Sequence, residues 1–378
     1  MTSKERVHAA LAGRPVDRTP VASSYTHLYF RDHFGELTGK EPWELHKWLN
    51  AEPEEHLKVF KRIIETVPFD ILQPETAPSR QARQDVEFVS RNGRVFRHNK
   101  RHGTMTPVTV HTVSGHAVDY AANETQYVFD KKDVSERVKV AKSEETIASG
   151  ANDYIEAVVK ALGRDHSIIS GGVTGTLWSC HQYVGLTNLL GLLVEKPDLV
   201  DYLSRKVFEQ AIESIRRLAA AGGDAIFIDD ALSTCDMISV KHYERFSLPH
   251  VTEMVREIHR LQHKAIVIYF GGVADRLDQV ASTGADALAM EASMKGYIND
   301  IGQAAKRIGQ RISLFGNVDP VGVLQDGTDA ELEDEVRRQA LAGKKARGFV
   351  MSTGSPITPA TPLWRVRRFI ELGRQEYR

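Results

Sequence analysis

The chain has 378 residues, of which 42% are hydrophobic and 26% are charged, and its formal net charge is −1. This composition is typical of a globular protein, and the near-zero charge argues against nucleic acid or an anionic membrane as a partner. Two cysteines exclude a disulfide framework and a zinc cluster built on cysteine pairs. The charged start of the chain lacks the apolar core of a signal peptide, and no run reaches the roughly 20 apolar residues of a membrane span. We therefore expect a cytoplasmic protein.

Eight short apolar runs recur along the chain and alternate with segments of helical periodicity. Uniformly apolar runs of this length are typical of buried parallel strands. In chain order, the expected strands are 21–24, 69–73, 167–170, 225–228, 265–268, 287–290, 312–315 and 349–352. The expected helices are 43–66, 144–162, 197–221, 240–261, 274–283, 298–308, 329–342 and 363–374. The pattern predicts an α/β fold, a (β/α)8 TIM barrel spanning residues 1–378 as a single domain. The alternative is an open doubly wound sheet, which lacks support because no G-x-G-x-x-G motif follows the first run.

A long segment, 78–133, interrupts this pattern after the second strand. Within it, 86–90 and 94–98 alternate in polarity and flank Asn92-Gly93, the signal of a type I′ hairpin. Segments 107–113 and 127–129 also read as strands. We therefore predict a β-rich insertion at the C-terminal face of the barrel. It either covers or reads the substrate, or it decorates the solvent side.

The catalytic candidates are polar residues at strand ends, where barrel enzymes place their chemistry. Asp229 and Asp230 follow the fourth strand, Tyr269 the fifth and Glu291 the sixth. Neighbouring strands lie ~4.8 Å apart, so these side chains are expected to converge on one substrate atom. A carboxyl group there should have a raised pKa and act as proton donor, with Glu291 as the leading candidate.

The candidate substrate-binding residues come from the remaining strand ends, where Tyr25 also lies. They are His27, Glu75, Trp178, His181, Tyr183, Asn317, Asp319 and Ser352. For several of these candidate residues, a purely structural role is an alternative. One of the two adjacent aspartates is expected to bind loop groups while the other faces the cavity. The Asn317 and Asp319 turn, and His181 with Tyr183 at a helix start, are equally consistent with local structure.

Four stretches resemble the uroporphyrinogen decarboxylase-like superfamily, in order and over almost the whole chain. They are 2–7 with 15–21, 236–239 with 246–249, the Leu-Phe-Gly-Asn-Val-Asp-Pro run 314–320, and the Phe-Val-Met-Ser-Thr-Gly-Ser-Pro-Ile run 349–357. The resemblance implies the barrel fold and one of two chemistries. These are decarboxylation of a tetrapyrrole's acetate groups, and methyl transfer to or from a corrinoid.

The decarboxylase branch binds its substrate carboxylates through two arginines after the first strand. The matching places here are Tyr25 and Tyr29, and a phenol cannot form a bidentate clamp. Gly172, Trp178 and Tyr183 keep part of a second decarboxylase signature. Arg31 near the first strand could serve instead, as could five arginines of the insertion: Arg80, Arg83, Arg94, Arg97 and Arg101.

The thiol-methylating members of the other branch carry zinc on a His-x-Cys after strand five and a cysteine after strand eight. Those places read Tyr269, Gly271 and Ser355, so no metal is expected on them. A zinc site elsewhere in the chain, built on carboxylates and histidine, is an alternative that the sequence leaves undecided. The resemblance then implies the demethylating component of a methyltransferase system. That component moves a methyl group from a small methoxylated or methylated substrate to the corrinoid (cobalamin) of a separate protein. A decarboxylating lyase and a non-catalytic relative are the alternatives, and a homodimer stays open.

Overall fold

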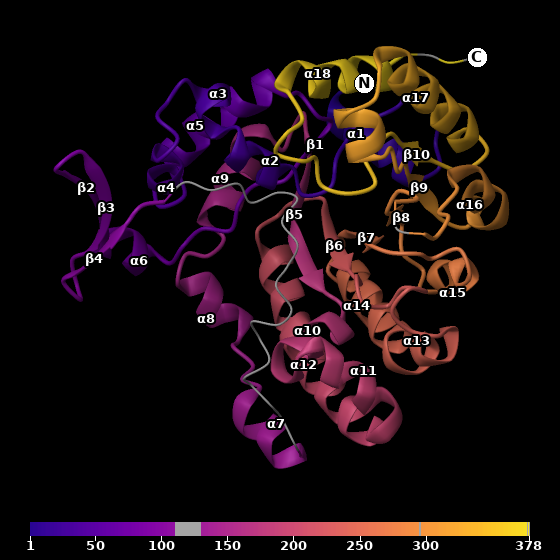
Figure 1. Ribbon diagram of the computed structural model, residues 1–378, viewed down its shortest axis with the longest axis horizontal. Helices are drawn as coiled ribbons and strands as arrows, with labels where there is room; N and C mark the ends of the chain where they lie inside the picture. The colour runs from indigo at the N-terminus through magenta and orange to yellow at the C-terminus, as the bar shows by residue number, and fades with distance from the viewer. Residues whose placement is uncertain (110–129, 295, 376, 378) are drawn as a thin grey trace.

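The computed structural model describes residues 1–109, 130–294, 296–375 and 377. At its centre lies one sheet of seven parallel strands, each paired with the next along the sheet and surrounded by helices (Figure 1). These strands are, in sheet order, β1 (Ile71–Leu72), β5 (Ser167–Thr174), β6 (Ala225–Asp229), β7 (Lys264–Tyr269), β8 (Ala287–Met290), β9 (Ser313–Phe315) and β10 (Phe349–Val350).

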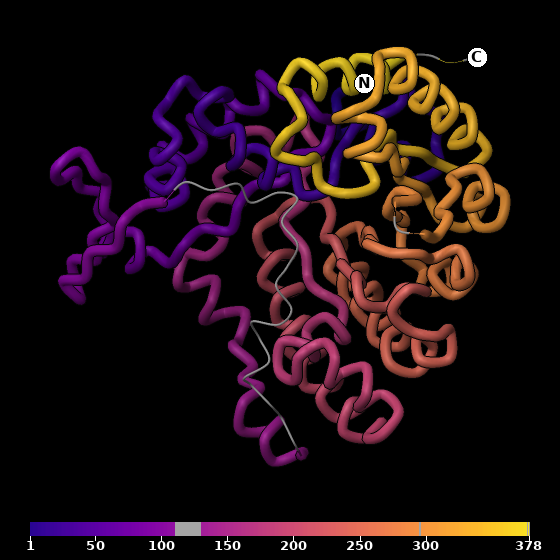
Figure 2. Tube along the Cα trace, in the orientation of Figure 1, coloured from indigo at the N-terminus to yellow at the C-terminus, as the bar shows by residue number. Residues whose placement is uncertain are grey.

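The eighth place in the barrel is taken by the segment around Val21. Val21 forms a parallel bridge with Met351, next to β10. On its other side, the Asp70 N–H donates to the Val21 carbonyl at 2.8 Å, next to β1. The sheet therefore closes through a segment near the N-terminus, which lies beside one near the C-terminus (Figure 2). The predicted (β/α)8 TIM barrel is confirmed, and the open doubly wound sheet is excluded.

The expected strands coincide with the observed ones to within a few residues. The run 287–290 is β8 without change, whereas β5 continues four residues past its predicted end, to Thr174. The extension contains Gly171 at φ 141°, and the register with β6 shifts between Ile169 and Gly172. Such a bulge redirects a strand at the rim of a barrel, and apolar runs alone do not reveal it.

Helices cover the outside of the barrel, and none among the described residues combines the length and apolarity needed to cross a membrane. Three expected helices are each split in two: 43–66 before Pro53, 144–162 around Gly150 and 240–261 at Ser247. The helices before β5 are α1 (Ser3–Leu11), α2 (Thr26–Asp32), α3 (Phe34–Thr38), α4 (Glu44–Trp48), α5 (Pro53–Thr66), α6 (Arg80–Asp85), α7 (Lys131–Arg137), α8 (Ser143–Ala148) and α9 (Asp153–Leu162). Those after β5 are α10 (Thr176–Val184), α11 (Leu186–Glu195), α12 (Pro197–Ala220), α13 (Val240–Phe246), α14 (Leu248–Arg260), α15 (Leu277–Ser282), α16 (Ile301–Ile308), the π-helix η2 (Pro320–Gln325), α17 (Asp329–Gly343) and α18 (Leu363–Gly373).

The predicted hairpin of the insertion is confirmed. Strands β2 (Val86–Arg91), β3 (Arg94–Asn99) and β4 (Thr104–Pro107) form an antiparallel sheet. Asn92 and Gly93 both have positive φ, at 51° and 73°, as a type I′ turn requires. This sheet stands apart from the barrel strands (Figure 1). The Phe88 ring lies 6.4 Å from that of Trp43. Of the two further expected strands, 107–113 is described only to residue 109, and 127–129 lies outside the described residues.

The closure of the barrel depends on the fully buried carboxylate of Asp70. It accepts hydrogen bonds from Arg6 at 3.0 Å, from both terminal nitrogens of Arg18 at 2.8 Å and from the Val21 N–H at 2.9 Å. Burial opposes its ionisation, but the Arg18 and Val21 hydrogen bonds hold the pKa of Asp70 below its ordinary value. Asp70 therefore joins α1, the first strand segment and β1 through one charge.

We predict that Asp70→Asn lowers the free energy of unfolding by about 3 kcal/mol at pH 7, because it removes the carboxylate partner of Arg18 and leaves Arg6 with Asp17 alone. The pKa of folded Asp70 lies below its unfolded value, so this stabilisation is present at neutral pH. It is lost as the pH falls through the lowered pKa. Chemical denaturation at pH 7 and at decreasing pH measures both effects.

Asp278→Asn is the matched control, since Asp278 also pairs with two arginines, Arg307 and Arg311, but at the surface. Exposed pairs contribute little, so its unfolding midpoint should stay close to that of the wild type. Equal effects of the two substitutions would show that Asp70 does not hold the barrel closed.

Candidate active site

Strand alternation decides which strand-end side chains reach the barrel axis, because successive side chains point to opposite sides of a sheet. The inner core contains alternate residues of the three central strands: Ala225, Phe227, Ile266, Ile268, Ala287 and Ala289. Continued by one step, this alternation directs Asp229, Phe270 and Glu291 towards the axis. It directs Asp230 and Tyr269 the other way, towards the surrounding helices.

The Asp229 side chain lies at the C-terminal end of β6, and its two carboxyl oxygens differ in their hydrogen bonding. Oδ2 accepts a hydrogen bond from the Tyr25 hydroxyl at 2.7 Å. Oδ1 is buried and has no hydrogen-bond partner among the described residues. Burial raises the pKa of Asp229 to about 7, with a further rise from the charge of Asp230 and against the lowering effects of the Tyr25 hydroxyl and the Ala231 backbone N–H. A carboxyl group in this state can hold and release a proton at neutral pH, as general acid–base catalysis requires.

Tyr25 reaches Asp229 from the first strand segment, three places away around the barrel. Its backbone is left-handed, with φ 51° and ψ 45°, at the N-terminal cap of α2. This conformation is rare for a bulky residue and costs on the order of 1–3 kcal/mol. Its ring lies 5.8 Å from Phe270 and 6.4 Å from Phe227. Burial, followed by the charge of Asp229, raises the pKa of Tyr25 well above its ordinary value, so the phenol stays a proton donor.

His27 and Glu75 lie close to each other on the same side of the barrel. Glu75 is buried and binds Arg31 through both oxygens, at 2.8 and 2.7 Å. Burial lowers the pKa of His27 despite the nearby Glu75 charge, so the imidazole is neutral at pH 7. Its ring lies 5.7 Å from that of Tyr25. This side of the open C-terminal end of the barrel, its mouth, therefore presents a neutral imidazole. Arg31, the arginine there, is already paired with Glu75.

Glu291 is held by a second cluster. One carboxylate oxygen accepts a short hydrogen bond from Tyr297, and the other accepts from Ser355 at 3.0 Å. Its carbonyl accepts from the side-chain amides of Asn299 and Asn317. Register places Asp229 opposite Ile268, and Ile268 opposite Ala289, so Glu291 lies one inward-facing layer above Asp229. No signal in the sequence points to Tyr297, and Ser355 stands out only as the place of a lost metal ligand.

Asp230 and Tyr269 do not join the mouth, which corrects the expected convergence of these strand ends. Asp230 is fully buried and accepts from Ser233 at 2.7 Å and Ser247 at 2.5 Å. The Tyr269 hydroxyl is bonded to that of Tyr243 on α13 at 2.9 Å. Asp230 therefore secures the segments that carry Ser233 and Ser247, and Tyr269 secures α13. Phe270, which polarity did not single out, occupies the inward position expected for Tyr269.

The predicted substrate-binding residues on α10 do not form one group, because Tyr183 has different contacts from His181 and Trp178. His181 is almost fully buried and bonds the Trp178 carbonyl through Nδ1, and burial lowers its pKa. The Trp178 ring packs edge-on against it at 4.7 Å. The Tyr183 hydroxyl accepts from Gln210 on α12 at 3.1 Å, so Tyr183 packs between helices and not at the barrel axis.

Three further candidates make local bonds at the ends of β9 and β10. Asn317 is buried and ties the loop after β8 through its bonds to the Glu291 and Asn299 carbonyls. Asp319 caps η2 by accepting from the N–H groups of Val321 and Gly322. The buried Ser352 hydroxyl donates to the Thr353 carbonyl at 3.1 Å. For Asn317 and Asp319 the structural reading of the sequence accounts for the observed contacts.

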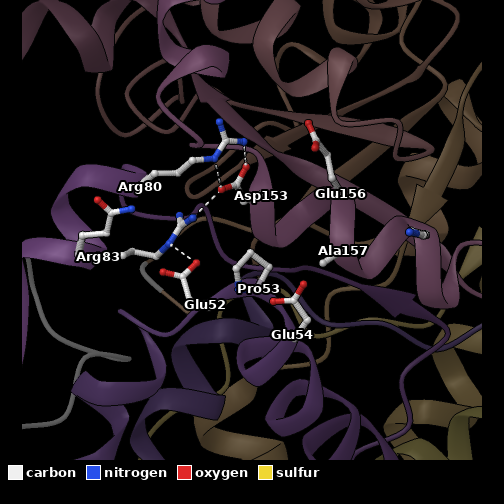
Figure 3. Close-up of a pocket in the computed structure, with 10 residues that line it drawn as sticks. Glu52, Pro53, Glu54, Arg80, Arg83, Asp153, Glu156 and Ala157 are labelled. Carbon is white, nitrogen blue, oxygen red and sulfur yellow. Dashed lines mark hydrogen bonds and ion pairs between the residues drawn. The ribbon is translucent and has the colours of Figure 1, made fainter.

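The arginines at the base of the insertion are paired away from the mouth. Arg80 and Arg83 line a cavity of about 420 Å³ between α5, α6 and α9. Both side chains point to Asp153 there (Figure 3). The two N–O distances are 2.6 Å each, and the Arg83 side chain is 2% exposed. These ion pairs fix α6, the first helix of the insertion, to the start of α9. Arg94, Arg97 and Arg101 lie on or beside the projecting hairpin.

The donor atoms at the family's zinc positions do not fit a thiolate zinc site. Tyr269 is bonded to Tyr243, and Ser355 donates to Glu291. Gly271 has no room for a larger side chain, because a Cβ there would lie 2.5 Å from the Thr234 hydroxyl. Across the described parts of the chain, no three His, Cys, Asp or Glu side chains are grouped to hold a metal ion.

We predict that Asp229→Asn stabilises the protein at pH 8 and changes its stability little at pH 4. The folded pKa of about 7 lies above the ordinary aspartate value, so wild-type stability falls as the pH rises from about 4 to about 7. Asparagine removes this penalty, and the gain at pH 8 should be on the order of 3 kcal/mol. Thermal unfolding across this pH range measures it.

Asp286→Asn provides a control of opposite sign. The hydrogen bonds of His259 and Lys264 overcome the effect of burial and lower the pKa of Asp286, so this substitution should destabilise the protein at pH 8. An Asp229→Asn protein less stable than the wild type at pH 8 would be incompatible with a protonated carboxyl at this site.

The family model of uroporphyrinogen decarboxylase (URO-D) matches residues 106–376. The uroporphyrinogen decarboxylase of Tolumonas auensis is 27% identical over 229 residues, which cover 58% of this chain and 61% of that protein. One from Coxiella burnetii is 27% identical over 233 residues, which cover 58% and 60%. The chain thus spans about three fifths of the length of these curated relatives.

A solved structure, a methyltransferase from Methanosarcina mazei, shares the fold with a TM-score of 0.70 at 20% identity, over 99% of this chain and 98% of that one. Since the family model matches more than half of the chain, this protein belongs to the uroporphyrinogen decarboxylase family.

Proposed function

We propose that this chain moves a methyl group from a small methoxylated or methylated compound to a corrinoid carried by a separate cobalamin-binding protein. The observation that carries the proposal is the Asp229 carboxyl. It faces the barrel axis, its pKa is raised to about 7, and its Oδ1 has no hydrogen-bond partner among the described residues. The Methanosarcina mazei methyltransferase adds the support of a shared fold.

The reaction needs a proton at the atom that loses the methyl group. When the bond between methyl and oxygen or nitrogen breaks, its electron pair remains on the heteroatom, and an alkoxide or phenoxide is a poor leaving group. The corrinoid supplies the metal that accepts the methyl group. Asp229 supplies the proton through Oδ1, while Tyr25 holds Oδ2. Phe270, Phe227 and the neutral His27 surround this pair with apolar and uncharged groups.

Decarboxylation of a carboxylated substrate is the second candidate, favoured by the names of the curated relatives. The arginines that the sequence offered for carboxylate binding argue against it. Arg31 is bound to Glu75, while Arg80 and Arg83 are bound to Asp153. Tyr29, at one of the family's arginine places, is buried and donates to the Thr361 carbonyl. A substrate with several carboxylates therefore meets few unpaired cations among the described residues of this region.

The assay incubates the chain with a reduced corrinoid protein and a panel of methoxyarenes and methylamines, and follows the absorbance change of corrinoid methylation. A parallel arm supplies uroporphyrinogen and follows carbon dioxide release. Methylation with a demethylated product supports the proposal. Carbon dioxide release supports the lyase, and inactivity in both arms supports a non-catalytic relative.

We predict that Asp229→Asn lowers the turnover of methyl transfer by about 10²-fold or more, the usual scale for loss of a general acid. The group acts in its protonated form, so the wild-type rate should fall as the pH rises through about 7. Steady-state rates measured from about pH 5 to about pH 9, roughly two units on either side of the pKa of Asp229, test both statements.

Glu291→Gln is the comparison within the mouth. Both oxygens of Glu291 already accept hydrogen bonds, from Tyr297 and Ser355, so its loss should reduce turnover less than that of Asp229 and leave the pH profile in place. A larger loss with Glu291→Gln, together with a flattened pH profile, would move the role of the acid to Glu291.

A further inference from the structure

We infer that Tyr25 is the positioning residue for the proton donor: it fixes one oxygen of Asp229 and leaves the other for the substrate. This inference rests on the proposed function and extends it to a residue that occupies a carboxylate-binding place in the family's decarboxylases. Tyr25 would act on the reaction only through Asp229.

The hydrogen-bond geometry separates the two oxygens of the carboxyl group. The Tyr25 hydroxyl donates to Oδ2 at 2.7 Å, whereas Oδ1 is buried without a partner among the described residues. A free carboxyl group can rotate and exchange its oxygens. The bond to Tyr25 removes this freedom and keeps the same oxygen unpaired, as a proton donor of defined orientation requires.

The position of Tyr25 is itself strongly constrained. Three non-glycine residues of the described chain have positive φ, namely Tyr25, Asn92 and Gln262. Asn92 is in a hairpin turn that favours such angles, but an aromatic residue has no such preference. Contacts with Phe227, Phe270 and His27 hold the ring from β6, from the segment after β7 and from its own helix. Strain of this kind persists where the surrounding structure fixes it, as at functional sites.

The ionisable groups around Asp229 are few. Tyr25 approaches from the first strand segment and Asp230 follows along the chain, while His27 lies beyond the Tyr25 ring. The Tyr25 bond and, more weakly, the Ala231 backbone N–H lower the pKa of Asp229, and the charge of Asp230 raises it. Burial and two serine hydroxyls hold Asp230 in place. Removing the phenol hydroxyl should therefore raise the pKa of Asp229 and leave its other neighbours in position.

The experiment compares Tyr25→Phe with Tyr29→Phe. Tyr25 caps α2 and Tyr29 lies one turn into it, and the hydroxyl of each donates one hydrogen bond, but that of Tyr29 goes to the Thr361 carbonyl. We expect Tyr25→Phe to lower kcat about tenfold with a smaller change in KM, because orientation is lost and binding is kept. Its alkaline rate limb should move to higher pH. Tyr29→Phe should leave the pH profile unchanged.

A direct titration keeps the inference independent of turnover. In protein labelled with ¹³C at aspartate carboxyls, with Asp229→Asn for assignment, the Asp229 signal should titrate at higher pH in Tyr25→Phe than in the wild type. A fluorinated tyrosine at position 25, which donates a stronger hydrogen bond and keeps the ring, should shift it to lower pH. This second variant also serves if Tyr25→Phe does not fold.

The possible outcomes distinguish the positioning role of Tyr25 from the proposed methyl transfer. Titration of Asp229 at the same pH in all variants, or equal kinetic effects of Tyr25→Phe and Tyr29→Phe, would overturn the positioning role. Opposite shifts with the two position-25 variants support it. A wild-type protein that transfers no methyl group but shows these shifts would refute the proposed function and still support the pairing of Tyr25 with Asp229.

Discussion

The alternation of side chains along the barrel strands is the constraint on which the site depends. Only every second residue of β6, β7 and β8 faces the axis, so the last inward positions belong to Asp229, Phe270 and Glu291. The residue next to each points into the layer between strands and helices. Two adjacent aspartates thereby acquire different environments. Asp229 faces the axis, and Asp230 is enclosed by serine hydroxyls behind the strand.

Closure of the barrel makes the contact across it possible. Asp70 fixes the Val21 segment between β10 and β1, and four residues later the chain turns through Tyr25 into α2. The phenol therefore meets a carboxyl from β6, three places around the barrel. Burial then raises the pKa of Asp229, since the low-dielectric surroundings disfavour the charged form. Fold and chemistry are linked here, because the same enclosure that destabilises the carboxylate allows it to hold a proton.

The sequence was sufficient to predict the barrel, since eight apolar runs separated by helical segments leave few alternatives. It was also sufficient for the hairpin at Asn92-Gly93, where local turn chemistry decides the structure. It was insufficient for the site, because the polarity of a strand end does not tell whether its side chain faces the barrel axis. Counting in twos from Ala287 leads to Glu291, and from Ile266 it leads to Phe270 and not Tyr269. The Tyr25–Asp229 pair joins residues 204 positions apart, and its left-handed backbone has no local sequence signal.

The most direct test of the account is a crystal structure of the protein with a bound methoxyarene or methylamine. With Asp229 as the proton donor, the oxygen or nitrogen that carries the methyl group should lie within hydrogen-bond distance of Asp229 Oδ1, about 2.6–3.2 Å. Tyr25 should still donate to Oδ2 in that complex. A donor whose heteroatom lies instead against Glu291 and Ser355, with Asp229 Oδ1 untouched, would contradict the assignment of Asp229 as the proton donor.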